Sequence, residues 1–510
     1  MSRKIDEGGP LAIAITGAAG AVGRCLVTAA AAAGHRVIAV DQVEADFSGV
    51  EGVEQRLGDL SRRRFCRQAV VGADVVIHAA ALNDPGLDYE ALSPLNVDAV
   101  RWLYEAAEDE GAERFVHLST AGLYRPGRGV LTEESAIEAL SAFTQTKLDA
   151  ERYLQSRPAD GLPWVILRPS LAYGPRCDAF GANLLTVPPL LRMFFAYVPG
   201  LTGGARNNWV HVEDIATAAM KVAAHPGLER EIYNVADDTP LAYGEILSSV
   251  IQSYGLHIGP TIPFPVALMV ALSPFVDSEL MLRFLSGLLG PLWKRVEQRH
   301  RLTGPLRPNV YRAGLAYLQG DRVTGTDKLK QLGWRPRWPD LREGMGETLR
   351  WYQHARWVPD YRALPDEDIL EEGVRLWYRE GFGLEGARSG RLEFTITFPD
   401  VRKLAFAQDA TIEGTVSIEG IADQSPVKGT LKVFKARRDM VYEFTFPSTG
   451  GHQSYRFSGR KHLTLLGIVS NFTRLEGNLV NTRGEEIGAL SWRMELKEDL
   501  TALVRSIRMG

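Results

Sequence analysis

The sequence predicts an α/β domain followed by an all-β domain. Over the first 355 residues, short apolar stretches that are typical of buried strands alternate with helical stretches. This alternation predicts a parallel sheet that is covered by helices on both faces. From Arg391 onward, apolar and polar residues alternate with a period of two, which predicts the antiparallel strands of a barrel or a sandwich.

The elements of the first domain follow one another in regular order. Buried strands are expected at 11–17, 35–41, 73–81, 114–120 and 164–170. An Ala-rich helix that ends at Gly34 is expected at 21–34, and a second helical stretch runs from about Val97 to Asp109.

In the second domain, the alternation starts with Leu392 and Phe394. It returns at 411–420, 429–435, 440–446, 454–459 and 489–496, between turns that contain Gly, Asp and Asn. A polar, acidic stretch connects the two domains. We therefore place the α/β domain at 10–355, a linker at 356–388 and the all-β domain at 389–510.

The composition excludes several classes of protein. A chain of 510 residues, with 45% hydrophobic and 24% charged residues, is typical of a folded protein with two or three domains. A net charge of −4 gives no global attraction to nucleic acid. Three cysteines far apart in the sequence predict neither a disulfide framework nor a metal site. Neither a signal peptide nor a run of about 18 apolar residues is found, so we expect a cytoplasmic protein.

The stretch TGAAGAVG (16–23) lies between the first strand and the first helix. Its glycines allow a tight turn, close approach of the backbone to a pyrophosphate and close packing of the helix, whose free N–H groups face the phosphates. Asp41 ends the next strand, where a carboxylate accepts hydrogen bonds from a ribose 2′-hydroxyl and repels a 2′-phosphate. The pattern predicts a Rossmann-type site for NAD rather than NADP, and a glycine turn without a ligand is the alternative. The loop residues expected to bind the cofactor are Gly17, Ala19, Gly20, Ala21, Val22 and Gly23.

Further motifs follow the glycine loop, namely Gly58-Asp59-Leu60, His78-Ala79-Ala80, Leu118-Ser119-Thr120, Lys147, Arg168-Pro169 and WVHVEDIA (209–216). In this order and spacing, residues 10–355 resemble the extended short-chain dehydrogenase/reductase family. The resemblance implies a doubly wound parallel sheet with a smaller substrate subdomain. It also implies that Lys147 holds the nicotinamide ribose and that Thr120 is the catalytic Ser/Thr. The other residues that it places at the cofactor are Asp59 and Leu60 near the adenine, and Ala79, Ala80, Arg168 and Pro169.

One position departs from the family. The residue four before the lysine is a catalytic tyrosine in the family, whereas here it is Phe143, which has no titratable group. Three hypotheses follow. Another group relays the proton, either Tyr124, Tyr173 or Tyr89, or water held by Lys147 and Thr120. Alternatively, the protein binds the nucleotide without turnover, or it catalyses a reaction that does not need the phenol.

Two apolar stretches, 263–295 and 184–200, fall where this family builds its substrate pocket. The first is too short in its apolar run to span a bilayer. It could lie on a membrane surface at the inner face, form an apolar lid or be a buried helix pair. Both stretches favour a large apolar ligand. The closest resemblance within the family is therefore to the 3β-hydroxysteroid dehydrogenase-like branch, and the nucleotide-sugar epimerases and dehydratases are the competing branch.

The β domain resembles a module attached to some bacterial cholesterol oxidase-like proteins. A barrel of this size could enclose one apolar ligand or only pack against the first domain. Its histidines, His452 and His462, are isolated in the sequence and are interpreted as surface residues.

We therefore expect an NAD-dependent oxidoreductase that acts on a sterol-like or lipid-like alcohol or ketone. Two alternatives stay open: a non-catalytic protein that binds NAD and lipid, and a nucleotide-sugar epimerase or dehydratase. The expected partner is an apolar small molecule and not nucleic acid. Peripheral membrane contact through 263–295 and a homodimer are both compatible with the sequence.

Overall fold

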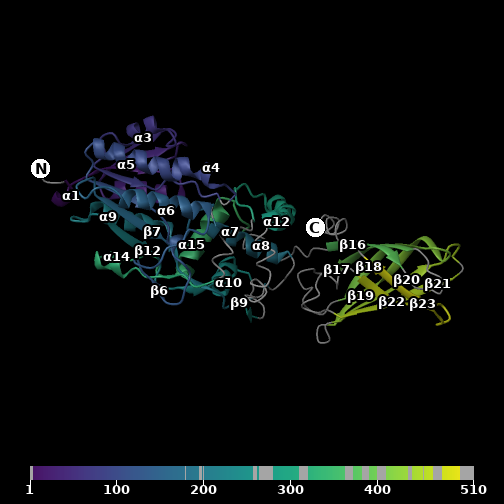
Figure 1. Cartoon of the computed structure of the whole chain (residues 1–510). Helices are drawn as coiled ribbons and strands as arrows, with labels where there is room; N and C mark the ends of the chain where they lie inside the picture. The colour runs from purple at the N-terminus through teal and green to yellow at the C-terminus, as the bar shows by residue number, and fades with distance from the viewer. Residues whose placement is uncertain are drawn as a thin grey trace. The chain divides into compact units, whose positions relative to one another are not determined.

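The computed structural model describes residues 4–84, 86–178, 180–193, 198, 200–256, 261–263, 279–308, 320–361, 372–381, 390–398, 409–434, 439–451, 453–462 and 474–493. The chain divides into two compact units (Figure 1). The first comprises Met1–Val187, Pro199–Ser286 and Arg301–Pro359. The second comprises Pro188–Val198, Gly287–His300 and Asp360–Gly510.

A parallel sheet of seven strands forms the centre of the first unit, in the order β12-β7-β5-β4-β1-β2-β3. The strand order reverses between β1 and β4, which is where open sheets of this type bind ligands beyond the carboxyl ends of their strands. The strands are β1 (Ala12–Thr16), β2 (Arg36–Asp41), β3 (Val53–Leu57), β4 (Val75–His78), β5 (Arg114–Leu118), β7 (Trp164–Pro169) and β12 (Glu231–Val235). The predicted doubly wound parallel sheet is confirmed.

Two layers of helices cover the sheet. On one face, α2 (Ala21–Ala32) and α9 (Val212–Ala224) bury apolar side chains in a common core with the strands. On the other face, α3 (Arg63–Val70), α5 (Ala99–Asp109) and α6 (Ala142–Gln155) form a second core. The helix expected from Val97 begins instead with a π-helical turn, Pro94–Asp98, that leads into α5. The edge strand β3 was not expected, because its exposed sequence VEQRL has no apolar run.

Shorter elements complete the chain before the barrel. Small two-stranded sheets pair β8 (Leu171–Tyr173) with β11 (Trp209–His211), β10 (Arg206–Asn207) with β13 (Leu241–Ala242), β9 (Leu201–Thr202) with β14 (Ile262–Pro263), and β6 (Val130–Leu131) with β15 (Val323–Thr324). The remaining helices are α1 (Lys4–Glu7), α4 (Tyr89–Ser93), α7 (Phe180–Asn183), α8 (Val187–Arg192), α10 (Tyr243–Ser253), α12 (Glu279–His300), α14 (Asp327–Gln331) and α15 (Leu341–His354).

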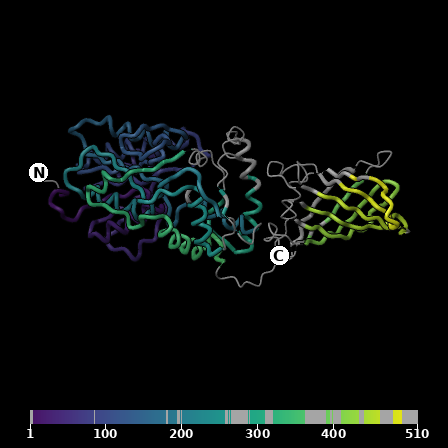
Figure 2. The backbone as a smooth tube through the Cα atoms, turned by 90° about the horizontal axis from the view of Figure 1, so that it is seen from below, coloured from purple at the N-terminus to yellow at the C-terminus, as the bar shows by residue number. Residues whose placement is uncertain are grey.

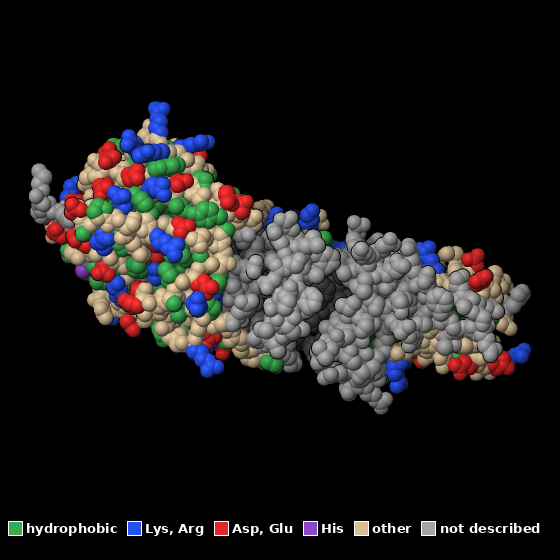
Figure 3. All heavy atoms as spheres, viewed as in Figure 1, with side chains coloured by type: hydrophobic (Ala, Val, Ile, Leu, Met, Phe, Trp, Pro, Cys, Tyr) green, Lys and Arg blue, Asp and Glu red, His purple; other side chains and the backbone are tan. Residues whose placement is uncertain are grey.

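The first apolar stretch is only partly described. Residues 264–278 of the stretch 263–295 lie outside the described residues, so the lid and the membrane contact stay predictions. Within the described ranges, no helix is both long and apolar enough to cross a membrane. On the face of the first unit drawn in Figure 3, acidic and basic side chains are interspersed and do not form a patch of one sign.

The second unit contains a closed barrel of antiparallel strands in sequence order (Figure 2). Closure by pairing of β16 with β23 decides between the predicted barrel and the predicted sandwich in favour of the barrel. The strands are β16 (Glu372–Gly381), β17 (Gly390–Phe398), β18 (Asp409–Ile418), β19 (Ala422–Phe434), β20 (Asp439–Pro447), β21 (Ser454–His462), β22 (Arg474–Asn481) and β23 (Glu486–Arg493).

The first strand of the barrel corrects the predicted domain boundary. β16 lies inside the range 356–388 that was interpreted as a linker, and it pairs with both β17 and β23. Its sequence EGVRLWYREG directly follows an acidic stretch, and Leu376, Trp377 and Tyr378 interrupt the alternation of apolar and polar residues. The local pattern therefore did not identify a strand that is defined by its two distant neighbours.

Aromatic side chains fill the barrel interior. Phe394, Phe444 and Phe457 are buried, and the rings of Phe444 and Phe457 stack with their centroids 4.7 Å apart. Glycines lie opposite these rings on the neighbouring strands: Gly414 pairs with Phe394 and Gly429 pairs with Phe444. A Cβ on either glycine would overlap backbone atoms of the neighbouring strand and the Cα and Cβ of the paired phenylalanine, so the close approach of these strands requires glycine there.

Candidate functional site

The glycine loop is folded tightly against the end of β4. Gly17 has a φ of +70°, and a Cβ on it would lie 2.8 Å from Ala80 Cα. The Gly20 N–H donates a hydrogen bond to the Gly17 carbonyl at 3.0 Å, which closes the turn. A Cβ on Gly23 would overlap the same carbonyl, so α2 approaches the loop only because position 23 is glycine. Helix α2 begins after Gly20 with no side-chain cap, so its first N–H groups are available to an anion.

Asp41 lies beside this loop, at the carboxyl end of β2. Its Oδ2 accepts a hydrogen bond from the Ala19 N–H at 2.9 Å, and its Oδ1 accepts from the Gln42 N–H at 2.7 Å. Gln42 also donates from Nε2 to Asp59 Oδ1 at 3.0 Å, which links the two acidic positions predicted at the cofactor. The Leu60 side chain is 3% exposed and belongs to the core between the sheet and α3, and its expected place near the adenine stays a prediction. Only its backbone could face a ligand.

The catalytic positions converge at the carboxyl end of β5. Helix α6 begins at a capping box of Ser141 and Thr144, which places Phe143 and Lys147 one turn apart. The Lys147 side chain is buried, and its Nζ donates to the Leu118 carbonyl at 2.8 Å. The ring centroid of Phe143 lies 5.9 Å from Nζ, so the phenylalanine occupies the neighbourhood in which the family has its phenol.

Thr120 lies two residues beyond Leu118 and is partly exposed. Its Oγ1 accepts a hydrogen bond from the Gly122 N–H at 3.0 Å and caps a short helical turn, so its hydroxyl proton remains available for a second partner.

Burial controls the electrostatics of the site. It lowers the pKa of Lys147 to about 8, although Glu151 on the next turn of α6 opposes the shift. His78 on β4 and His117 on β5 stack with centroids 5.6 Å apart on the same face of the sheet. Burial and the nearby Lys147 lower the pKa of His78 to about 3 and hold that of His117 well below its usual value. Both imidazoles are therefore neutral at pH 7.

None of the three candidate tyrosines has the setting expected of a substitute acid. The Tyr124 hydroxyl is buried, donates to Asn234 Oδ1 at 2.6 Å and accepts from Arg168 Nη1 at 3.0 Å, and burial raises its pKa to about 12. The Tyr89 hydroxyl donates to Asp149 Oδ2 at 3.0 Å. Tyr173 is 2% exposed and packs against His211 and α15. The geometry therefore argues against the prediction that Tyr124 replaces the phenol.

Arg168 corrects the predicted set of cofactor ligands. Its Nε donates to Glu151 Oε1 at 3.0 Å and its Nη2 to Glu151 Oε2 at 2.6 Å, and both side chains are buried. Ser119 Oγ donates to the same Oε1 at 2.5 Å. The guanidinium thus holds α6 to β7 inside the protein and does not face a ligand. Its neighbour Pro169 ends β7 at the carboxyl edge of the sheet.

The sequence reasoning missed Asn96, which is fully buried in the π-helical turn before α5. Its Oδ1 accepts from the Leu82 N–H at 2.8 Å. Its Nδ2 donates to the Leu82 carbonyl at 2.9 Å and to Thr146 Oγ1 at 3.1 Å. It therefore ties the segment after Ala79 and Ala80 to the residue beside Lys147. The available signal was an asparagine two residues after Pro94, within an otherwise helical stretch.

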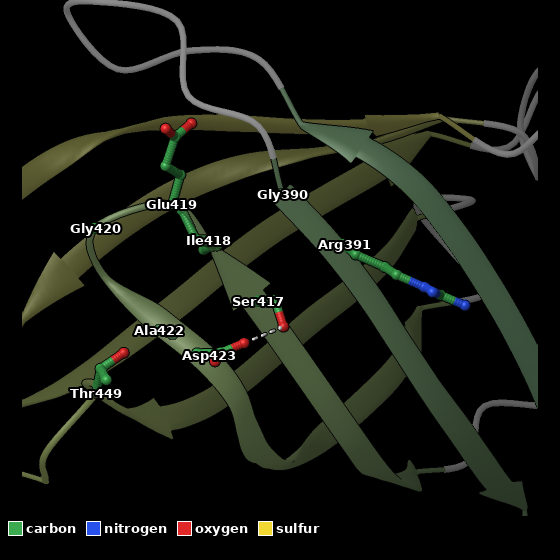
Figure 4. Close-up of a pocket in the computed structure, with 9 residues that line it drawn as sticks. All are labelled: Gly390, Arg391, Ser417, Ile418, Glu419, Gly420, Ala422, Asp423 and Thr449. Atoms are coloured by element: carbon green, nitrogen blue, oxygen red, sulfur yellow. Dashed lines mark hydrogen bonds between the residues drawn. The ribbon is translucent and has the colours of Figure 1, made fainter.

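The barrel has a surface hollow that is unlike the site on the first unit (Figure 4). It is lined by residues of β17, β18 and β19, by the turn after β18 and by Thr449. The Arg391 and Glu419 side chains point away from each other, and Asp423 faces Ser417 on the neighbouring strand. The charged groups do not converge on one point, so the hollow offers no catalytic arrangement. Among the described residues, no group of three His, Cys, Asp or Glu side chains could hold a metal ion.

Comparison with known proteins gives the first unit its relatives. Residues 13–236 match the NAD dependent epimerase/dehydratase family. The 4-hydroxy-2-methyl-3-oxo-4-farnesyl-3,4-dihydroquinoline-1-oxide ketoreductase of Stigmatella aurantiaca is 28% identical over 261 residues, which are 50% of this chain and 76% of that protein. The sterol demethylase protein B of Methylococcus capsulatus is 28% identical over 273 residues, 52% of this chain and 80% of that protein. The 3-beta-hydroxysteroid dehydrogenase of Mycolicibacterium neoaurum is 23% identical over 261 residues, 48% of this chain and 70% of that protein.

A solved structure agrees with the fold. The dTDP-glucose 4,6-dehydratase DesIV of Streptomyces venezuelae, with NAD bound, superposes with a TM-score of 0.51 at 20% identity. The match covers 68% of this chain and 98% of that chain, and at this identity it supports the fold alone.

Proposed function

We propose that this chain, whose residues 13–236 form an NAD-dependent epimerase/dehydratase domain, is an oxidoreductase for a hydroxyl or keto group on a large apolar molecule. Sterol-like and lipid-like alcohols and ketones are the substrate class. The observation that carries the proposal is the apolar start of α6, where the Phe143 ring lies 5.9 Å from Lys147 Nζ and Leu82 and Leu140 are exposed, whereas a nucleotide sugar would need polar partners. The β domain and the apolar stretch 263–295 stay candidates for further lipid contact.

The cofactor fits the residues present. The loop at Gly17, Gly20 and Gly23 has no side chain that would obstruct a pyrophosphate, and the uncapped start of α2 faces it. The Asp41 carboxylate is suited to accept from a ribose 2′-hydroxyl and would repel a 2′-phosphate, which favours NAD over NADP. When bound, NAD supplies the acceptor or donor of a hydride. Lys147 and the backbone of Ala79 and Ala80 are the neighbours proposed for its nicotinamide end.

Thr120 and Phe143 have separate tasks in this proposal. Thr120 Oγ1 donates to the substrate oxygen and fixes its position, because its one internal bond leaves the proton available. Phe143 makes the wall beside that oxygen apolar and excludes water, which strengthens the remaining electrostatic interactions.

Three apolar side chains extend the wall around the first turn of α6. Leu140, 43% exposed, directly precedes the Ser141 cap. Leu82, 37% exposed, is held to the same helix through Asn96 and Thr146. With Phe143, they offer contact area to a substrate that is apolar on this side. The ketoreductase and the two sterol-related relatives support the same substrate class.

The test is NADH formation by the natural chain and by Phe143→Tyr, with NAD and a panel of 3β-hydroxysteroids and isoprenoid alcohols. Turnover by the natural chain on an apolar alcohol is the expected result. The variant should be faster, because general acid–base catalysis by a phenol typically contributes about 10²–10⁴-fold. Silence from both chains, together with thermal stabilisation by UDP- or dTDP-sugars, would move the function to the nucleotide-sugar branch.

The substitution at Phe143 favours one second candidate, a protein that binds NAD and an apolar ligand without turnover. This alternative predicts that only Phe143→Tyr forms NADH, whereas both chains bind NAD with equal affinity. NADH formation by the natural chain separates the two functions, and isothermal titration with NAD shows whether a chain without activity still binds the cofactor.

A further inference from the structure

We propose that Lys147 itself carries the reacting proton: its neutral amine accepts the proton of the substrate hydroxyl, and its ammonium returns that proton in the reverse direction. This proposal builds on the proposed function, since it names the acid and base of the same site. It assigns to the lysine the role that a phenol has in the related enzymes.

Nζ is held at the carboxyl end of β5, the edge of the sheet that also carries Thr120. Nζ is anchored at 2.8 Å on the Leu118 carbonyl, two residues before Thr120, which is proposed to hold the substrate oxygen. Phe143 lies one turn before Lys147 on the same face of α6. Its side chain has no hydrogen-bond donor or acceptor that could compete for the proton. In the described part of the chain, Lys147 forms no ion pair, so no carboxylate holds its proton.

The surroundings of Lys147 allow it to lose a proton near neutral pH. Glu151, its neighbour on the next turn of α6, is already bound by Arg168 and Ser119. His78 from β4 and His117 from β5 face the lysine from the sheet, and both are neutral and fully buried. Burial therefore outweighs the attraction of Glu151 and brings the pKa of Lys147 to about 8, near the optimum for a group that both takes and gives a proton.

The other hydroxyls near the site do not compete. Tyr124 and Tyr89 are bound to Asn234 and Asp149, and Tyr173 is buried against α15. The hydroxyl of Thr120 orients the substrate oxygen, but an aliphatic alcohol is too weak an acid to replace a phenol. His78 and His117 have strongly lowered pKa values and are therefore weak bases, so among the residues that the structure describes here Lys147 is the remaining candidate.

The proposed proton transfer and the hydride transfer together conserve atoms and electrons. In oxidation, the O–H bond of the substrate breaks and an N–H bond forms on Nζ. At the same time the carbinol carbon loses a hydride, for which NAD would be the acceptor. The products are a carbonyl compound, reduced cofactor and the Lys147 ammonium, which then releases its proton to water. In reduction, the ammonium protonates the oxygen as hydride reaches the carbon.

The first measurement reads the proton directly. The full chain is labelled with [ε-¹³C]lysine, the Lys147 signal is assigned by its loss in Lys147→Met, and the chemical shift is followed from pH 6 to 11. We expect Lys147 to titrate about two units below the other lysines. A midpoint near 10 would overturn the proposal, because the group would stay protonated in the working range.

The second measurement links that titration to the reaction. With an alcohol substrate, kcat/KM of the natural chain should rise with pH and level off above the midpoint found by NMR. Lys147→Arg retains the positive charge near the cofactor but cannot lose a proton at these pH values. It should bind NAD by calorimetry within about tenfold of the natural chain, and lose about 10²–10⁴-fold in kcat. Lys221→Arg on α9 is the matched control and should retain natural kinetics.

The outcomes separate this proposal from the function on which it builds. If Lys147→Arg turns over like the natural chain, the lysine is not the acid and base, although the oxidoreductase function stands. If only Phe143→Tyr is active, the natural chain binds NAD without turnover, and the proposed function and the proton role of Lys147 both fall. If Phe143→Tyr also forms no NADH with any alcohol, the proposed function falls, and the proton role falls with it.

Discussion

Phe143 and Lys147 lie one turn apart on α6, and the phenylalanine ring faces the ammonium at 5.9 Å. A cation–π contact favours the charged lysine by about 0.5–2 kcal/mol. Removing the ammonium from water disfavours the charged form, and the pKa of about 8 shows that this desolvation is the larger effect. The burial of Lys147 therefore makes its charge costly to maintain, in spite of the contact with Phe143.

This cost predicts how the stability of the chain depends on pH. The folded-state pKa of Lys147, about 8, lies below its ordinary value of 10.5, so the unfolded state binds more protons between these pH values. Stability should rise with pH across that window. Lys147→Met should stabilise the first unit by about 1–3 kcal/mol at pH 7, since one pKa unit corresponds to about 1.4 kcal/mol.

Urea unfolding at pH 7 and pH 10 measures this effect. The gain in stability from Lys147→Met should be smaller at pH 10 than at pH 7. The effect of Lys221→Met on stability should show no comparable pH dependence. A variant that is less stable than the natural chain at pH 7 would contradict the burial argument.

Tyr124, Arg168 and Glu151 form one buried network, in which Arg168 donates to both of the others. Glu151→Gln should destabilise the first unit by about 3–5 kcal/mol, because it leaves the guanidinium charge buried without its counter-charge. Tyr124→Phe removes one hydroxyl and should cost about 1–3 kcal/mol. Thermal unfolding of both variants gives the comparison.

The same pair tests whether Tyr124 takes part in the chemistry. If its hydroxyl is structural, Tyr124→Phe should retain NADH formation within about twofold at a temperature well below its melting point. A loss of two orders of magnitude, with NAD binding intact, would return Tyr124 to the list of proton donors.

The turn between β1 and α2 depends on close backbone approach at its glycines, in addition to the hydrogen bond between the Ala19 N–H and Asp41. Gly23→Ala places a methyl group against the Gly17 carbonyl, so the loop or the helix must shift. We expect a loss of NAD affinity of about tenfold or more and a lower melting temperature, because the phosphate site is built from these backbone positions.

Gly346→Ala in α15 is the matched control for this prediction. A Cβ on Gly346 would meet no atom within 4 Å, and alanine is the better helix former. We expect Gly346→Ala to leave NAD affinity, measured by calorimetry, unchanged and to increase stability slightly. Equal NAD affinity in Gly23→Ala would show that the loop tolerates the side chain.

The two compact units have separate hydrophobic cores, one set around the parallel sheet and one inside the barrel. Calorimetry of the full chain should therefore resolve two unfolding transitions. Phe444→Ala removes a ring that stacks on Phe457 in the barrel core. It should lower the free energy of unfolding of the barrel by about 3–5 kcal/mol, and with it the temperature of one transition. NAD should raise the temperature of the other transition only. If the Phe444→Ala substitution or the addition of NAD shifted both transitions, the two cores would not be independent.

Five of the seven strands of the parallel sheet, the phosphate loop and the absence of the phenol could be predicted from the sequence, because each depends on residues close together in the chain. The edge strands β3 and β12 were not expected. Alternating apolar runs identified the parallel sheet, and the glycines at 17, 20 and 23 identified its loop. The spacing of four residues between Phe143 and Lys147 is about one helical turn, so their proximity on α6 follows from the sequence.

The tertiary structure settled what depends on residues far apart in the chain. The Tyr124 hydroxyl meets Asn234, which is 110 positions away, and Arg168 turns toward Glu151 rather than toward a cofactor. The barrel begins at β16 because that strand pairs with β23, more than a hundred residues later. A local sequence pattern cannot predict contacts between residues so far apart in the chain, because these side chains meet only after the elements between them have packed.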